Sequence, residues 1–157
     1  MLNLPYYKQT EEFTCGPVCL QMLFEFFGKK LDSKKISSLV AATALYGTSH
    51  LALIRVVKNF GFYSYAHTNS SLKDIKYFID LGLPVLVNYL ESSNNEGHYA
   101  LVVGYTLTSL VMNDPWNGEH FKINFKEFDK RWFNSTRRSR KSLLVISDKK
   151  IKLASRK

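Results

Sequence analysis

The sequence lacks any long hydrophobic run. Among its 157 residues, no window holds the roughly 18 uncharged apolar residues that a membrane-spanning helix requires. The first residues, Met1 to Lys8, contain no basic start followed by an apolar core, so no secretory signal is visible. We therefore expect neither a membrane span nor secretion, and predict a cytoplasmic protein.

Cysteine is scarce as well. The only two are Cys15 and Cys19, and helix geometry would strain a bridge between residues four apart. Two thiols do not make a disulfide scaffold, and they suit a reducing compartment. The Cys-x₃-Cys spacing also lacks the close ligand pairs of structural zinc sites, so we expect no metal. No cofactor site is indicated either.

Acidic residues are nearly absent from the C-terminal part. Residues 130–157 hold 11 Lys or Arg and one acidic residue, whereas residues 1–100 hold 9 basic and 8 acidic residues. The net charge of +9 therefore belongs to the C-terminal part. Four of its cations form what we call the basic segment, which is predicted to be a loop open to an acidic substrate or partner: Arg137, Arg138, Arg140 and Lys141. Residues 149–157 are expected to form a solvated, partly disordered basic tail, and nucleic acid is not the expected partner.

What is present is a single domain with a real core. Apolar residues make up 45% of the chain, and the length fits one domain, which we place at residues 1–148. Capping residues, glycine stops and hydrophobic periodicity predict helices early and strands late. The expected helices are 15–27, 33–42, 50–60, 71–82 and 126–132, and the expected strands are 62–67, 84–90, 99–105, 110–113, 121–125 and 142–147. This order indicates an α+β fold with an antiparallel sheet.

Four residues have the chemistry of a cysteine nucleophile site. Cys15 begins the first predicted helix, with Pro17 in its first turn, and a helix N-terminus favours the thiolate over the thiol. His98 follows Gly97 at the start of a strand and could carry a proton to a leaving group. Asp114, at the end of the partner strand, could fix the imidazole tautomer. The Gln9 amide could donate to a developing oxyanion, beside the backbone N–H of Cys15.

A lone cysteine on a helix stripe is usually a packed apolar residue, and Cys19 is interpreted that way. Simple alternation raises one difficulty for the other candidates. A regular hairpin that pairs Tyr105 with Leu110 sets Asp114 opposite Leu101, on the face away from His98. A His98–Asp114 pair therefore needs a bulge, a shifted register or positions outside the ladder.

Three segments together resemble the C39-like peptidase family of papain-fold cysteine peptidases. They are Gln9-x₅-Cys15-Gly16-Pro17, Gly97-His98-Tyr-Ala-Leu-Val-Val-Gly104-Tyr105 and Asn113-Asp114-Pro115-Trp116-x-Gly118. The resemblance implies a papain-like fold in which the Cys15 helix packs on the antiparallel sheet. It also implies Cys15 as nucleophile, His98 as base, Asp114 as orienting acid and Gln9 as oxyanion donor, with Trp116 shielding the His98–Asp114 pair.

The function predicted on this basis is a cysteine peptidase or amide hydrolase acting on a peptide. Family members known as parts of peptide exporters cut leader peptides after a double glycine, but this chain shows no transporter segments and no ATP-binding motif. A papain-fold acyl transferase would use the same residues and is not separated by sequence. A binding module for peptides or nucleic acid is the third alternative, and the intact set of four residues argues against it.

Overall fold

The computed structural model describes residues 1–42, 48–133 and 140–154. Its helices are α1 (Cys15–Phe26), α2 (Ser33–Val40), α3 (His50–Asn59), α4 (Leu72–Asp80) and α5 (Phe125–Arg131). Its strands are β1 (Tyr63–His67), β2 (Val85–Leu90), β3 (Gly97–Tyr105), β4 (Ser109–Asp114), β5 (Gly118–Asn124) and β6 (Leu143–Ser147).

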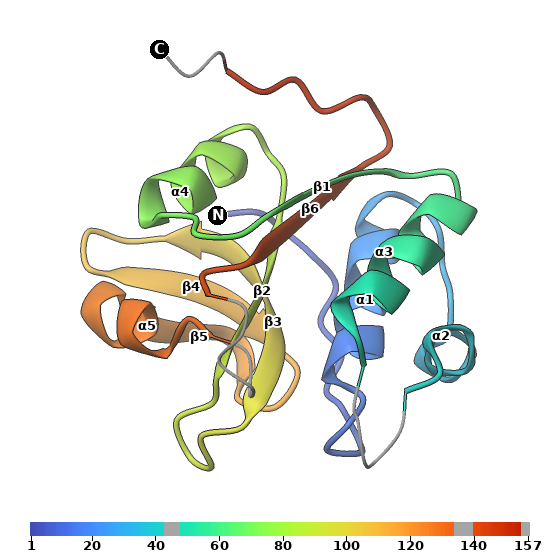
Figure 1. Ribbon diagram of the computed structural model, residues 1–157, viewed down its shortest axis with the longest axis horizontal. Helices are drawn as coiled ribbons and strands as arrows, with labels where there is room; N and C mark the ends of the chain where they lie inside the picture. Colours follow the sequence, from blue (N-terminus) through green and yellow to red (C-terminus); the bar gives the residue numbers. More distant parts are fainter. Residues whose placement is uncertain (43–47, 134–139, 155–157) are drawn as a thin grey trace.

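The strands form one six-stranded sheet in the order β1-β6-β2-β3-β4-β5, and each pairing in the described residues is antiparallel. Helices α1, α2 and α3 lie on one side of this sheet, and α4 and α5 lie on the other (Figure 1). Two apolar clusters fill the two interfaces. Because side chains alternate along a strand, the strands supply both clusters: Leu101 packs with α1, whereas Val102 packs on the opposite face.

The predicted α+β, papain-like architecture is confirmed. The local signals that predicted the helices are also visible. Asp32, Ser49 and Ser71 accept backbone N–H bonds at the starts of α2, α3 and α4. The clearest difference is β5, which begins at Gly118 rather than at 121, because its first residue pairs with Asp114.

A β-bulge resolves the alternation problem of the β3–β4 hairpin. Tyr105 pairs with Leu110 as expected, but the register shifts between Val102 and Gly104, and Leu101 pairs with Asn113. Continuing this register sets Asp114 opposite Ala100 instead of Leu101. Ala100 and His98 are two residues apart and share a face of the sheet, so the bulge brings Asp114 to the face of His98.

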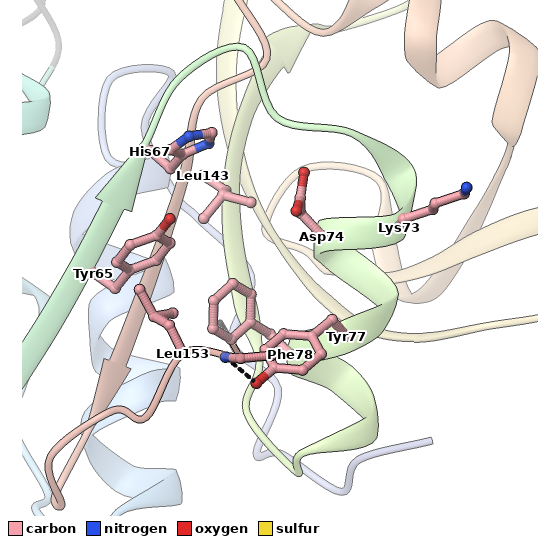
Figure 2. A pocket seen from close by; sticks show the side chains of 9 residues that line it. Tyr65, His67, Lys73, Asp74, Tyr77, Phe78, Leu143 and Leu153 are labelled. Carbon is pink, nitrogen blue, oxygen red and sulfur yellow. Dashed lines mark hydrogen bonds between the residues drawn. The ribbon is translucent and has the colours of Figure 1, made fainter. Parts of the chain in front are cut away.

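The described part of the C-terminal tail is mostly exposed, but it makes contacts with the domain. Ile151 packs against the apolar cluster under α4, and the N–H of Ala154 donates to the Tyr77 hydroxyl at 3.0 Å (Figure 2). Leu153 and Ala154 form one wall of an open pocket of about 570 Å³ between α4, β1 and β6, which none of the four candidate residues lines. Burial of the apolar Ile151 favours this contact, whereas Leu153 stays half exposed.

The basic segment is only partly described, because Arg137 and Arg138 lie outside the described residues. The Lys141 ammonium pairs with Asp129 at 2.8 Å, and the Arg140 guanidinium lies over the Phe133 ring. Among the described residues, no helix has the length and apolar character needed to cross a membrane.

Candidate active site

Cys15 is the first residue of α1, and no side chain caps the N-terminus of this helix. Thr14, at the N-cap position, makes no capping bond to the helix, since its hydroxyl donates to the Glu11 carbonyl instead. The first turn also holds no acidic residue. The backbone N–H groups beside the thiol are therefore not neutralised by a cap or a carboxylate, and the helix end favours negative charge at this point.

His98 joins the thiol to a carboxylate. Its Nε2 atom lies 2.7 Å from Oδ1 of Asp114, and the Cys15 side chain is near enough to raise the pKa of the imidazole. Burial alone lowers the pKa of His98, but the bonds to Asp114 and Cys15 and their charges outweigh it and raise the pKa to about 10. The imidazole is thus held as an imidazolium beside the ionised Asp114 carboxylate at neutral pH.

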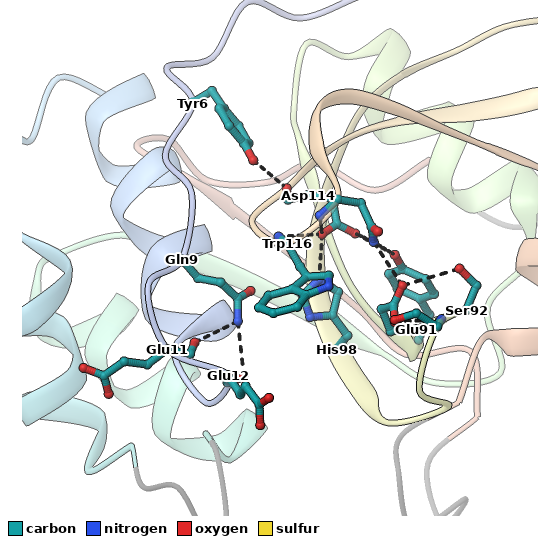
Figure 3. Close-up of polar contacts among 12 residues, drawn as sticks. Tyr6, Gln9, Glu11, Glu12, Glu91, Ser92, His98, Asp114 and Trp116 are labelled. Carbon is teal, nitrogen blue, oxygen red and sulfur yellow. Dashed lines mark hydrogen bonds and ion pairs between the residues drawn. The ribbon is translucent and has the colours of Figure 1, made fainter.

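Asp114 is fully buried and is surrounded by donors (Figure 3). Its Oδ1 accepts the backbone N–H groups of Trp116 and Asn117 besides His98. Its Oδ2 accepts the Tyr89 hydroxyl at 2.6 Å and the Asn117 side-chain amide at 3.2 Å. Burial raises the pKa of Asp114, but these hydrogen bonds and the charge of His98 outweigh it and lower the pKa, so the carboxylate stays ionised.

Tyr89 and Asn117 were not singled out by the sequence. Tyr89 pairs with His98 across β2 and β3, and its hydroxyl is buried against Asp114. No sequence signal separates it from other strand aromatics. Asn117 could have been predicted from the sequence. Asp114 followed by Pro115 favours a turn in which the carboxylate accepts the N–H groups two and three residues later. Asn117 also bonds to Glu91 and so extends the network away from His98.

Gln9 lies beside His98, but its side-chain N–H groups are already hydrogen-bonded. The Nε2 atom donates to the backbone carbonyls of Glu11 and Glu12 at 2.9 and 3.2 Å. The Oε1 atom is buried and has no hydrogen-bond partner. The backbone N–H of Gln9 donates to the Pro115 carbonyl, which ties this segment to the turn after Asp114. The structure therefore brings Gln9 to the other three candidates, with its carboxamide oxygen unpaired.

Cys19 contrasts with Cys15. It is completely buried, and burial, with smaller contributions from Cys15 and Asp114, raises the pKa of its thiol well above the ordinary value. Trp116, by comparison, is 44% exposed and lies at the mouth of the site beside His98 (Figure 3). In the part of the chain that the structure describes, no group of three or more His, Cys, Asp or Glu side chains is placed to hold a metal ion.

The profile of one protein family covers most of this chain. The Peptidase_C39 like family matches residues 1–140, which include all four candidate residues. The chain belongs to the C39-like family of cysteine peptidases. The sequence resemblance drawn from three short motifs is confirmed by this match.

Individual relatives agree with the family. The chain is 28% identical over 133 residues to the transport/processing ATP-binding protein ComA of Streptococcus pneumoniae, a match that covers 83% of this chain but 18% of that protein. The C39-like chain thus spans about a fifth of the length of this curated relative.

Solved structures show the same fold. The peptidase domain of Streptococcus ComA, described as a bifunctional ABC transporter, superposes with a TM-score of 0.76 at 18% identity, covering 95% of this chain and 100% of that domain. A double glycine motif protease from an AMS/PCAT transporter, solved in complex with a leader peptide, gives 0.73 at 19% identity, covering 92% and 91%.

Proposed function

We propose that this C39-like cysteine peptidase cleaves peptide bonds with Cys15 as nucleophile, His98 as acid and base, and Asp114 as the group that orients and charges His98. The observation that carries the proposal is the 2.7 Å ion pair between His98 and Asp114, at a place where the Cys15 side chain also raises the pKa of His98. Such a chain of nucleophile, base and orienting group is the arrangement that covalent catalysis requires.

The proposed reaction uses each group in turn. The Cys15 thiolate attacks the substrate carbonyl carbon, and the imidazolium of His98 gives its proton to the amine as the C–N bond breaks. A thioester remains on Cys15. Neutral His98 then takes a proton from water, whose oxygen attacks the thioester, and the C–S bond breaks to restore thiolate and imidazolium. Asp114 stays ionised throughout, and its charge stabilises the protonated His98.

The developing oxyanion needs donors. We propose the backbone N–H of Cys15, which lies at the uncapped start of α1, and the Gln9 side-chain amide. Because both bonds of Gln9 Nε2 go to adjacent carbonyls of one loop, the proposal requires that one of them be exchanged for the oxyanion when substrate binds. Catalytic hydrogen bonds that tighten only with substrate are common.

For the substrate we propose a peptide, and leader peptides with a double glycine are the first class to test. The support is the relationship to transport and processing proteins and the fold shared with a double glycine motif protease. Two unpaired thiols, Cys15 and Cys19, fit a reducing compartment, so we propose a cytoplasmic site of action.

The test is cleavage of a synthetic double-glycine peptide by the purified chain, followed by mass spectrometry. Cys15→Ala should abolish cleavage, whereas Cys19→Ala, a matched loss of a buried thiol four residues away, should retain it in the folded protein. An added amine such as glycine amide separates hydrolysis from acyl transfer, because transfer yields the amide adduct as the main product. Cleavage that survives in Cys15→Ala would refute the assignment of the nucleophile.

A further inference from the structure

A small acidic recess lies beside His98, between the loop that precedes α1 and the loop that joins β2 to β3. Its walls include Glu12, Glu91, Glu96, Gln9, His98 and Trp116. Its volume is about 30 Å³, close to the space that one water molecule occupies. A cavity of this size can hold a single small polar head and no more.

The charge of the acidic recess is opposite to that of the whole chain. The protein carries a net charge of +9, yet three of the residues that line this recess are glutamates, and His98 is the one cationic residue among the described lining residues. Glu91 is buried and accepts hydrogen bonds from Ser93 and Asn117. Burial raises the pKa of Glu91, but these bonds and the charge of His98 outweigh it and lower the pKa, so Glu91 is ionised at neutral pH.

Arg131, on α5, lies close to the loop that joins β2 to β3. Its guanidinium bonds to Asn95, next to Glu96, and also to Glu127 one helical turn away. The charge of Arg131 is therefore already balanced by a carboxylate of its own helix. Arg131 is therefore not left free to neutralise the glutamates of the acidic recess.

A second observation points to a ligand that donates hydrogen bonds. Gln9 is 5% exposed, and its Oε1 atom lacks a partner although the side chain lines the acidic recess. The orientation of the amide is fixed, because Nε2 donates to two backbone carbonyls and a flipped amide would set oxygen against oxygen. A buried acceptor without a partner costs desolvation free energy, and a bound ligand that donates a hydrogen bond to Oε1 would remove this cost.

Trp116 supplies the remaining wall. Its indole is 44% exposed, and the open face of an indole attracts a nearby cation. Carboxylates, an unpaired carbonyl oxygen and an aromatic face together suit a primary ammonium group. A guanidinium is also cationic, but its planar fork needs more room than about 30 Å³ offers.

We propose that the acidic recess binds the ammonium group of a lysine side chain in the substrate peptide, close to the bond that is cut. This inference rests on the proposed peptidase function and adds a substrate preference to it. A free α-amino group of a peptide has the same chemistry, and the experiment separates the two sources.

The first test needs no substrate. Cys15 is treated with 2-aminoethyl methanethiosulfonate, which is cationic, and with neutral methyl methanethiosulfonate, and peptide mapping locates the label. The ratio of the two rates cancels changes in the intrinsic reactivity of the thiol. Exposed charges contribute modestly, so we expect each of Glu12→Gln and Glu96→Gln to lower the ratio about threefold, and the double variant roughly tenfold. Glu11→Gln is the matched control, because its side chain does not line the acidic recess.

The second test measures binding of dye-labelled double-glycine peptides to Cys15→Ala by fluorescence anisotropy. Acetylated peptides carry lysine or norleucine at each position that flanks the glycines in turn, and a norleucine peptide with a free amino terminus forms the third arm. We expect one lysine position to bind several-fold more tightly, and Glu12→Gln/Glu96→Gln to abolish the difference. A preference confined to the free amino terminus would assign the acidic recess to an α-amino group instead of lysine.

The outcomes separate this inference from the proposed function. Equal reagent ratios in all variants, together with equal binding of lysine and norleucine peptides, would overturn the acidic recess as an ammonium site even if wild-type protein cleaves both peptides. Charge-dependent ratios and lysine-selective binding without any cleavage would support the ammonium site and refute the peptidase reaction instead. If neither reagent reaches Cys15, the binding measurement alone decides.

Discussion

The hydroxyl of Tyr89 is expected to stabilise the ionised form of Asp114, and Tyr89→Phe removes that hydroxyl with little change of shape. The oxygen atoms lie 2.6 Å apart, and both side chains are almost fully buried. Without the hydroxyl, the Asn117 amide at 3.2 Å remains as donor to Oδ2. The variant therefore tests whether Tyr89 positions Asp114 or only fills space under α5.

A hydrogen bond to a buried charged group contributes about 1.5–3 kcal/mol to stability. Since one pKa unit corresponds to about 1.4 kcal/mol, the pKa of Asp114 should rise by roughly one to two units in Tyr89→Phe. The folded protein holds the pKa of Asp114 below its ordinary value, so its contribution to stability is present above the unfolded value of about 3.9 and is lost as pH falls through the folded value. The stability difference between wild type and Tyr89→Phe should therefore be full near neutral pH and shrink in acid.

The assay is urea denaturation of both proteins across a range from acidic to neutral pH, with NMR of the Asp114 carboxyl carbon to follow its titration. Tyr99→Phe is the matched control, because Tyr99 is a buried strand tyrosine whose hydroxyl is near the neutral Asn88 instead of a carboxylate. That variant should lose stability without this pH dependence. If Tyr89→Phe leaves the titration of Asp114 unchanged, or destabilises equally at all pH values, the positioning role is refuted.

Three further predictions follow from the site. Cys15 should react with iodoacetamide at neutral pH far faster than the fully buried Cys19, and His98→Ala should slow this reaction markedly; equal rates at both cysteines, located by peptide mapping, would contradict an activated Cys15. Gln9→Ala should retain folding and thiol labelling but lower turnover of a cleaved peptide by about 10²–10³, and turnover at the wild-type rate would exclude Gln9 as oxyanion donor. Neutralising the basic segment should lower kcat/KM for an acidic peptide at low salt with kcat nearly unchanged, because exposed charges are screened over about 10 Å at 0.1 M; an unchanged salt response would mean that the segment is simply solvated.

Local sequence was enough to predict the elements that depend on neighbours in the chain. Pro17 in the first turn and Gly28 just after the end bracket α1, and this local chemistry sets Cys15 at a helix start. The succession of early helices and late strands determined the α+β class. The order of the Gln9, Cys15, His98 and Asp114 motifs was enough to recognise the family.

How these residues meet depends on contacts between distant parts of the chain. The bulge between Val102 and Gly104 brings Asp114 to the face of His98, and strand register depends on packing partners that are distant in sequence. Tyr89 reaches Asp114 from β2 for the same reason, and the acidic recess exists only because two separate loops meet beside His98. Local propensity acts over a few residues, whereas hydrogen-bond partners and charge clusters are set by contacts between segments that only the folded chain brings together.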